Sequence, residues 1–350
     1  MLWQDIPVPV HKIIMKYFIK TFGCQMNIAD SERIAGWYEE MGWVLADKIE
    51  DTDEIIINSC SVRESAENRV FGLVDNLSKL KIVNCKLKII LTGCMLRLPK
   101  KVLTKKLPAV DEFKKTEELA HGSSLTVHGS PIHAWVPISN GCNNFCTYCV
   151  VPYARGREVS KPFEEIICEV KELAKRGYKK ITLLGQNVNS FQPSFAKLLV
   201  ALNRISGIKR ISFITSNPWD LTDEIIEAMS LSKIDRYLHL PVQSGDDEIL
   251  KKMNRPYTAQ EYLDLVKKIK ERIPKIKFGT DIIVGFPGET ERQFENTVEL
   301  CKKVGFVKAY ISRYSPRPGT AAFRLKDDVP PEEKKRRWRI LEELINHGNI

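Results

Sequence analysis

The sequence has no long uninterrupted apolar run, although hydrophobic residues make up 43% of its 350 positions. None of its hydrophobic stretches approaches the roughly 20 residues that a membrane-crossing helix needs. The first ten residues contain two prolines, one acidic residue and no basic cluster, so we expect no secretory signal. These two absences predict a cytoplasmic protein that does not associate with membranes.

A disulfide framework is also not expected. The chain has nine cysteines, an odd number, and we expect no export signal, which indicates a reducing compartment and thiols that serve metals. Acidic residues are outnumbered, 44 against 54 Lys and Arg, which leaves a net charge of +10. This balance fits a polyanionic partner such as nucleic acid, but it equally fits a basic surface that only keeps the protein soluble.

Three of the cysteines form a C-x3-C-x2-C run within residues 139–157. They are Cys142, Cys146 and Cys149. Iron–sulfur clusters are normally held by four thiolates, so three would leave one iron open to a substrate. Gly141 and Pro152 favour a loop here over a helix. Two alternatives stay open, namely structural thiols on one helix face and a zinc site with His133 as the nearest outside ligand.

Residues 16–128 are predicted to form a first domain, after a lead of residues 1–15. Its predicted strands, 16–22, 53–58 and 87–92, alternate with helices near 30–41 and 66–80, the first of them capped by Asp30. This rhythm is typical of an open parallel α/β sheet with crossover helices. The Gly- and Ser-rich end of residues 104–130 predicts the join to a second domain.

Each predicted strand of the first domain is followed by a cysteine. These are Cys24, Cys60 and Cys94. The carboxyl ends of parallel strands line one edge of a sheet, about 5 Å apart, so the fold could assemble a second three-thiolate site there. Gly23 and Gly93 suit tight turns around a bulky ligand. The alternative is three small buried residues at strand ends. We expect the remaining Cys85, Cys168 and Cys301 to be structural.

Residues 131–350 are predicted to form an incomplete parallel barrel of six β/α units. The expected strands are 134–138, 180–185, 210–215, 236–240, 277–284 and 307–312, and the expected helices are 163–176, 194–205, 222–229, 246–272 with breaks, and 290–304. Such barrels carry function on the loops after their strands, and the C-x3-C-x2-C loop follows the first strand.

Polar residues near the ends of later strands predict a nucleoside-binding rim, although such clusters often mean only turns. The candidate ligand-binding residues are Gln186, Ser216, Gln243 and Asp281. His239 is expected to be a satisfied core histidine, and Arg317 could bind a phosphate or a carboxylate. Most of the basic run of the final helix is expected to face solvent, though it could also touch RNA. That run comprises Lys334, Lys335, Arg336, Arg337 and Arg339.

Across residues 16–347 the sequence resembles the methylthiotransferase branch of the radical S-adenosylmethionine enzymes. The motifs that carry the resemblance are Thr21–Glu32, Asn58–Glu64, Thr92–Met95, Gly141–Glu158, His239–Asp246 and Gly285–Thr290. Asn143 to Phe145 and Val150 to Tyr153 look like the branch that acts on isopentenyl-adenosine in tRNA.

The resemblance implies that Cys142, Cys146 and Cys149 hold a [4Fe–4S] cluster whose open iron binds S-adenosyl-L-methionine. One electron then yields a 5′-deoxyadenosyl radical that takes hydrogen from C2 of N6-isopentenyladenosine beside the anticodon. It implies that Cys24, Cys60 and Cys94 hold an auxiliary [4Fe–4S] cluster that presents or supplies sulfur, methylated by a second S-adenosyl-L-methionine. The fold implied for residues 131–350 is a (β/α)6 radical S-adenosylmethionine barrel.

The implied partners are the anticodon stem-loop of tRNA and an electron donor such as a flavodoxin or ferredoxin, and we expect a monomer. Relatives usually continue into an RNA-binding TRAM domain, whereas this sequence ends at Ile350. We therefore expect either a truncated chain or tRNA binding by the two enzymatic domains. Two alternatives to this activity remain, namely the same chemistry on threonylcarbamoyl-adenosine tRNA or a ribosomal-protein aspartate, and a non-catalytic iron–sulfur or tRNA-binding protein.

Overall fold

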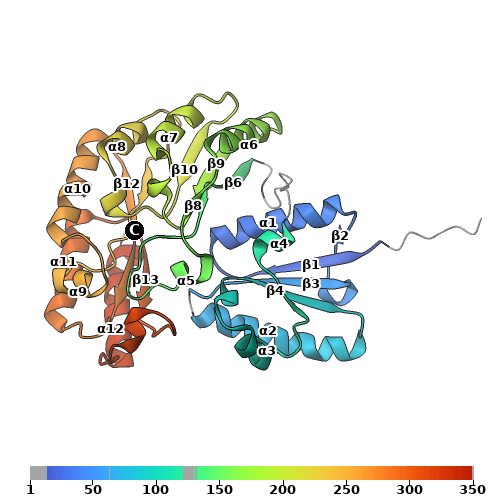
Figure 1. Ribbon diagram of the computed structural model, residues 1–350. Helices are drawn as coiled ribbons and strands as arrows, with labels where there is room; N and C mark the ends of the chain where they lie inside the picture. Colours follow the sequence, from blue (N-terminus) through green and yellow to red (C-terminus); the bar gives the residue numbers. More distant parts are fainter. Residues whose placement is uncertain (1–13, 63, 121–129, 131, 349–350) are drawn as a thin grey trace, which may run out of the picture.

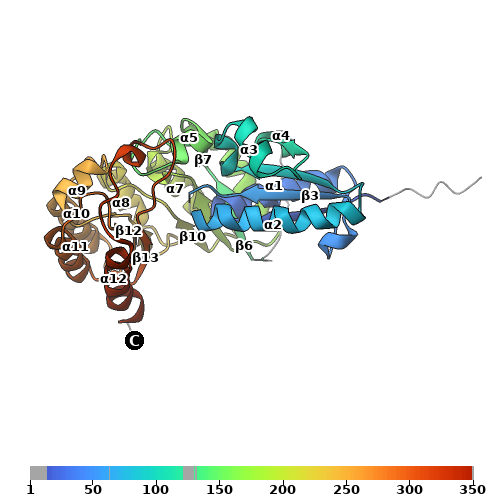
Figure 2. The ribbon, with the colours of Figure 1, turned by 90° about the horizontal axis from the view of Figure 1, so that it is seen from below.

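The computed structural model describes residues 14–348 except 63, 121–129 and 131. It shows two α/β domains side by side, a five-stranded sheet with its helices and an open barrel (Figures 1 and 2). Almost all of the lead of residues 1–15, and the expected boundary at residue 128, lie outside the described residues. No helix within the described ranges is both long and apolar enough to cross a membrane.

The first domain is built on a parallel sheet of order β2-β1-β3-β4-β5, which confirms the expected open parallel α/β architecture. Its strands are β1 (Lys16–Thr21), β2 (Val44–Leu45), β3 (Glu54–Ser59), β4 (Lys88–Gly93) and β5 (Glu112–Phe113). Its helices are α1 (Gln25–Glu40), α2 (Glu64–Val83), α3 (Lys100–Lys106) and α4 (Thr116–Leu119), with a 3-10 turn, η2 (Cys94–Arg97), after β4. The short strands β2 and β5 were not expected, and β5 extends the sheet beyond residue 107.

The central strand β3 is buried along its whole length, because helices cover both faces of the sheet. Ile55 and Ile57 pack in a cluster with α2, whereas Ile56 packs in a cluster with α1. This alternation follows from the two-residue period of a strand. The continuous run of isoleucines at residues 55–57 therefore belongs to a strand that is covered by helices on both faces.

The prediction that Asp30 caps a helix is wrong. Helix α1 begins at Gln25, directly after Cys24, and Asp30 lies inside it. Asp30 is buried because its carboxylate accepts a hydrogen bond from Arg155 of the second domain at 2.8 Å. The sequence favours a cap because aspartate is common at helix N-termini. The sequence does not show that Asp30 has a cationic partner in the other domain.

The second domain contains the six expected barrel strands in two parallel three-stranded sheets, of order β10-β9-β6 and β11-β12-β13. The strands are β6 (His133–Pro137), β9 (Lys180–Leu184), β10 (Arg210–Phe213), β11 (Tyr237–His239), β12 (Lys277–Val284) and β13 (Lys308–Arg313). The helices are α6 (Phe163–Lys175), α7 (Phe195–Asn203), α8 (Asp223–Met229), α9 (Asp247–Lys252), α10 (Ala259–Arg272) and α11 (Glu291–Val304). An isolated parallel β-bridge between Ile211 of β10 and Ile234, just before β11, lies where the two sheets separate.

The barrel core lies between the strands and the outer helices. Alternate strand residues such as Ile181, Leu183 and Ile211 belong to one large apolar cluster with those helices. The other face of each strand points into the barrel and carries polar residues, among them Thr182. Packing thus fixes the barrel wall from outside, and the inner face is left for polar side chains.

The final helix α12 (Pro331–Leu341), continued by a π-helical segment (Glu342–His347), exposes Lys335, Arg336 and Arg339, so most of its basic run faces solvent as expected. Lys334 and Arg337 of the basic run are buried, not solvated. Arg337 donates to the Glu289 carboxylate at 2.8 Å, and Lys334 donates to Asp327. Each cation is buried with a carboxylate, which offsets its desolvation. The run is therefore partly a packing element, and only its other cations can face RNA.

Candidate functional site: two cysteine trios at the domain junction

The first trio lies on an irregular loop after β6, which rules out the helix-face alternative. Residues 141–150 contain no helix, and the short antiparallel pair β7 (Ser139–Asn140) and β8 (Val159–Ser160) holds the base of this loop. Helix α5 (Val151–Arg155) follows it. Gly141 has a φ of 85°, and a Cβ there would lie 2.1 Å from the Arg157 carbonyl oxygen, so only glycine fits. The sequence motif is thus a tightly folded loop.

The second trio is assembled by strand register. Thr21 is paired with Asn58, and Ser59 is paired with Gly93, so the residues that follow these strands emerge at one edge. Cys24 follows β1, Cys60 follows β3 and Cys94 begins η2 after β4.

Close approach of the backbone explains the two glycines beside this trio. A Cβ on Gly23 would lie 2.8 Å from the Cβ of Cys60, and one on Gly93 would lie 2.4 Å from the Ser59 carbonyl oxygen. Both glycines have a positive φ, 132° and 87°, that other residues rarely adopt. These positions therefore require glycine so that the three cysteines can approach one another.

The zinc alternative finds no support. Within the described parts of the chain, no group of three or more His, Cys, Asp or Glu residues is arranged to hold a single metal ion. His133, the proposed fourth ligand, forms a hydrogen bond with the Thr182 hydroxyl at 2.9 Å through Nε2 and contacts the Trp135 ring. A cubane cluster differs from a single ion because each thiolate binds a different iron, so its ligands stand farther apart.

Burial dominates the pKa of the cysteine thiols, although Arg155 acts in the opposite direction on Cys94 and Arg255 on Cys149. Burial, followed by the neighbouring Cys146, raises the pKa of Cys149 to about 12. Burial also raises the pKa of Cys142 and of Cys94, and Cys60 and Cys24 add to the effect at Cys94. A metal cluster reverses this balance because its irons stabilise the thiolates. Both trios therefore have the donor chemistry that an iron–sulfur cluster requires.

Two of the four predicted rim residues lie on the β9 and β10 side of the barrel. The Gln186 side-chain oxygen accepts a hydrogen bond from the Gly141 N–H, so Gln186 supports the first cysteine loop. Ser216 is buried, and its hydroxyl has no hydrogen-bond partner among the described residues. Ser139, which the sequence analysis missed, is buried with an equally unpartnered hydroxyl. Unsatisfied buried hydroxyls are uncommon and suit a polar ligand.

The other two lie on the β11 and β12 side. Gln243 has a φ of 67°, and its backbone N–H donates to the Asp281 carbonyl oxygen at 2.9 Å. Asp281 lies inside β12 and not after it, and its carboxylate bonds to Nε2 of His239 at 3.1 Å. His239 is buried and satisfied, as expected. Within the described parts of the chain, no hydrogen bond joins Gln186 or Ser216 to Gln243 or Asp281.

Sequence reasoning missed Arg255, which follows α9 and is buried against the first trio. Its Nη1 lies 3.5 Å from Sγ of Cys146, and Nη2 donates to the Pro241 carbonyl oxygen at 2.9 Å. The guanidinium carbon lies 4.5 Å from the centre of the Trp219 ring. A lone Arg-Pro pair between two helices carries no sequence signal for such a contact.

Two ion pairs join the domains next to the second trio. Arg155 of α5 pairs with Asp30, and its charge acts on Cys94 and Cys24. On the other side, Arg317 pairs with Glu67 of α2 at 2.7 Å. The prediction that Arg317 could bind a carboxylate is confirmed, and that carboxylate belongs to the first domain.

Further contacts surround Glu67. Its carboxylate also accepts from the Ser61 hydroxyl and lies 3.5 Å from Arg97, which in turn donates to the Pro318 carbonyl oxygen at 2.9 Å. Arg317 donates to the Ser61 carbonyl oxygen at 2.6 Å. Because Ser61 directly follows Cys60, this network attaches the end of the barrel domain to the auxiliary trio.

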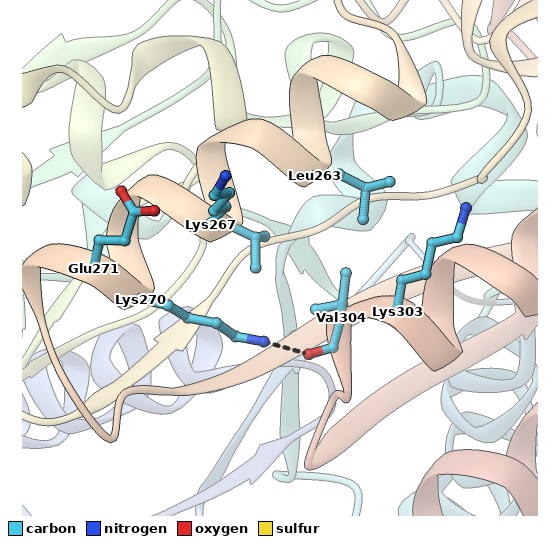
Figure 3. A pocket seen from close by; sticks show the side chains of 7 residues that line it. Leu263, Lys267, Lys270, Glu271, Lys303 and Val304 are labelled. Atoms are coloured by element: carbon cyan, nitrogen blue, oxygen red, sulfur yellow. Dashed lines mark hydrogen bonds between the residues drawn. The ribbon is translucent and has the colours of Figure 1, made fainter.

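A surface hollow of about 390 Å³ between α10 and α11 lies apart from both trios, on the outer helical layer (Figure 3). Leu263, Val266 and Val304 line it together with charged side chains, and Lys270 donates to the Val304 carbonyl oxygen at 2.8 Å. None of the predicted site residues lines it. We therefore assign it no part in the chemistry.

Comparison with known proteins agrees with this site. The family model described as the Radical SAM superfamily matches residues 136–301, and the one described as uncharacterized protein family UPF0004 matches residues 16–114. Among solved structures, the radical S-adenosylmethionine methyltransferase TsrM from Kitasatospora setae aligns with a TM-score of 0.65 at 12% identity, covering 89% of this chain and 77% of that one. The cobalamin-dependent enzyme OxsB aligns with a TM-score of 0.58 at 10% identity, covering 94% and 56%. At such identities these likenesses show the fold alone.

The fold and the C-x3-C-x2-C loop thus define a radical S-adenosylmethionine enzyme. Curated relatives named tRNA-2-methylthio-N(6)-dimethylallyladenosine synthase are 47% identical in Carboxydothermus hydrogenoformans, over 94% of this chain and 83% of the relative, and 47% identical in Dehalococcoides mccartyi, over 94% and 82%. A Clostridium botulinum relative of the same name is 44% identical over 95% and 82%. The chain belongs to this family of methylthiotransferases.

Proposed function

We propose that the chain methylthiolates C2 of N6-isopentenyladenosine next to the anticodon of tRNA. The observation that carries this proposal is the presence of two cysteine trios in one molecule, one on the barrel loop and one at the sheet edge beside it. An aromatic C–H offers no useful acidity, so acid–base side chains cannot activate it and a radical cofactor is required. One trio alone would explain S-adenosylmethionine cleavage, but it would leave the sulfur unexplained.

One [4Fe–4S] cluster would be held by Cys142, Cys146 and Cys149, and its open iron would bind S-adenosyl-L-methionine. The second cluster would be held by Cys24, Cys60 and Cys94. When bound, these groups supply hydrogen abstraction and the sulfur atom. The chain's own residues bind and orient them. Gln186 fixes the loop backbone at Gly141, and the unpartnered hydroxyls of Ser139 and Ser216 offer hydrogen bonds to a polar ligand.

The placement of the remaining ligand residues is part of this proposal. Gln243 and Asp281 would contact S-adenosyl-L-methionine from the β11 and β12 side of the barrel, and His239 would orient the Asp281 carboxylate. The proposed partners are the anticodon stem-loop of tRNA and a flavodoxin or ferredoxin that supplies electrons. We propose a cytoplasmic monomer that binds the tRNA phosphates through its net charge of +10.

An anaerobic reconstitution tests this function. We expect about eight irons per chain, as two cubanes require, and the 2-methylthio nucleoside in isopentenylated tRNA after addition of S-adenosyl-L-methionine and reductant. Mass analysis of the digested tRNA detects the product. A protein that carries both clusters and leaves isopentenylated tRNA unmodified would refute the proposal.

The choice of acceptor is tested in the same assay. Threonylcarbamoyl-adenosine tRNA and the ribosomal-protein aspartate replace the isopentenylated substrate, and we expect no methylthio product on either. Formation of 5′-deoxyadenosine separates an active enzyme with another acceptor from a non-catalytic protein. RNA binding without this cleavage would favour the non-catalytic alternative.

A further inference from the structure

Among the described residues, no carboxylate forms a hydrogen bond or an ion pair with the buried guanidinium of Arg255. Only 6% of its surface is exposed. Within the described residues, each hydrogen bond of its guanidinium goes to a neutral oxygen or to a sulfur, on Tyr257, Pro241, Asn217 and Cys146. This differs from the other buried cations described above, which pair with carboxylates. Burying a cation is costly unless an anion compensates it.

The surroundings hold this guanidinium rigidly in one plane. Trp219 and Tyr257 lie against it, with ring centres 4.5 and 5.4 Å from the guanidinium carbon. Nε lies 3.3 Å from the Tyr257 hydroxyl, and Nη1 lies 3.3 Å from the Asn217 side-chain oxygen. Nη1 also lies 3.5 Å from Cys146 Sγ, so among the described residues the first cysteine trio provides the thiolate in direct contact with Arg255, whereas the Asp220 carboxylate feels the charge of Arg255 without a hydrogen bond to it.

We propose that Arg255 is a positioning residue that supplies the counter-charge of the radical-generating cluster and raises its reduction potential. This inference rests on the proposed function, because it assumes a cluster on Cys142, Cys146 and Cys149. One electron passes from a low-potential donor of the flavodoxin or ferredoxin class to the cluster. No bond forms or breaks in that step, and the negative charge beside Arg255 increases by one.

The direction of the effect follows from charge. A fixed cation beside a sulfur ligand stabilises the more negative, reduced state, and an N–H···S hydrogen bond acts in the same direction. Low dielectric strengthens both effects at a buried site. Lysine could supply the charge but not the planar group that stacks on Trp219 while it donates in several directions. We therefore expect arginine to be required for the full effect.

The test measures the midpoint potential of this cluster alone. In a background where Cys24, Cys60 and Cys94 are each replaced by alanine, only the first trio can carry iron. We compare Arg255→Met and Arg255→Lys with the parent by redox titration followed by electron paramagnetic resonance, with iron counts as a check of loading. The potential should shift to more negative values in Arg255→Met and less far in Arg255→Lys.

Arg337→Lys is the matched control, because Arg337 is equally buried but paired with Glu289. It should leave the potential unchanged. If Arg255→Met binds too little iron, Arg255→Gln, which keeps an N–H donor without the charge, takes its place in the same titration. An unchanged potential in fully loaded Arg255→Met, or in Arg255→Gln where it replaces that variant, would overturn the proposal.

Reductant strength provides a second readout. The rate of S-adenosylmethionine cleavage by Arg255→Met, relative to the parent, should fall by a larger factor with dithionite than with the stronger reductant titanium(III) citrate. An equal loss with both would mean that Arg255 acts only on structure. Failure of the proposed function appears differently, as a wild-type chain with both clusters loaded and unchanged S-adenosylmethionine cleavage that makes no methylthio product.

Discussion

The two cysteine trios differ in what assembles them. Cys142, Cys146 and Cys149 lie on one loop, and their spacing alone predicts a site. Cys24, Cys60 and Cys94 come from three strand ends, and only the register of β1, β3 and β4 brings them together. The comparison teaches that the first site depends mainly on one loop, whereas the second depends on the whole sheet and on the barrel domain attached to it.

The trios also differ in their electrostatic partners, although both use an arginine of the barrel domain. Arg255 contacts Cys146 within its own domain, and no carboxylate of the described residues is hydrogen-bonded to it. Arg155 reaches across the junction, where it pairs with Asp30 and acts on Cys94. The second trio is thus completed by the domain that holds the first, so the two sites form one unit and not two modules.

The strongest test of this comparison removes one ligand from each trio. Cys146→Ala should abolish S-adenosylmethionine cleavage, because the first cluster loses its attachment. Cys60→Ala should spare cleavage and stop sulfur insertion, because only the second cluster is lost. High-performance liquid chromatography of 5′-deoxyadenosine and mass analysis of tRNA nucleosides measure the two outcomes. Equal loss of cleavage in both variants would contradict the division of labour between the trios.

The next test targets the strand ends that only the second trio needs. Gly93→Ala should reduce the iron content from about eight to about four per chain, because its Cβ would meet the Ser59 carbonyl oxygen at 2.4 Å where φ is 87°. Such strain costs of order 1–3 kcal/mol. Gly72→Ala is the matched control, since it meets open space in α2. A Gly93→Ala protein with a full iron count would show that this turn does not position Cys94.

A smaller effect is expected from the domain attachment. Arg317→Met removes the cation at 2.7 Å from the Glu67 carboxylate, but Arg97 at 3.5 Å still compensates it, so the cost stays well below the roughly 3–5 kcal/mol of a buried charge left without any partner. The second trio should then be displaced from the barrel, so more 5′-deoxyadenosine should form per methylthio product. We measure that ratio. Both products come from folded molecules only, so the ratio does not change when a variant merely lowers the fraction of molecules that are folded.

The surface pair of Arg336 and Glu333 provides the control for this attachment. Arg336 is about half exposed, and exposed pairs contribute about 0–1 kcal/mol. Arg336→Met should therefore leave the ratio at its parental value. If Arg317→Met also kept the parental ratio at full iron content, the network around Glu67 would have no role in coupling the two sites.

The sequence predicted most of the fold because its patterns are local. The six barrel strands and the strands β1, β3 and β4 follow apolar runs that end at turn residues. The edge strand Val44–Leu45 was missed, because two exposed residues carry no apolar pattern. The six cysteines are predicted as two sites, since one trio has a motif spacing and the other follows three strands.

Long-range partners were beyond the sequence. The sequence predicts a helix cap at Asp30, and it does not show which two cations of the final helix, Lys334 and Arg337, are buried, because neither pattern reveals the partner of opposite charge. Arg255 gave no signal at all, since its contacts come from residues distant in sequence. Local patterns therefore predict which cysteines form the two sites, and tertiary structure shows which charges surround them.

The smallest expected effect concerns pH on the side of the second trio. Glu32 lies in α1, two residues beyond Asp30, and burial raises its pKa to about 7. The folded chain therefore holds a proton that the unfolded chain releases near pH 4.5. Stability from this group is complete below pH 4.5 and is lost as the pH rises through about 7, by at most about 3 kcal/mol. Urea unfolding of the metal-free full chain at several pH values should show this decline.

Glu32→Gln should remove that part of the pH dependence, because a neutral amide cannot lose a proton. Glu299 of α11, which is exposed, can be changed to Gln as the control and should preserve the decline. A Glu32→Gln chain that keeps the full decline between pH 4.5 and 7 would show that burial of this carboxyl does not govern it. If Glu32→Gln removes this loss of stability and the control does not, the titrating group lies in α1, the helix that follows Cys24. The pH dependence of stability then belongs to the domain of the second trio and not to the loop of the first.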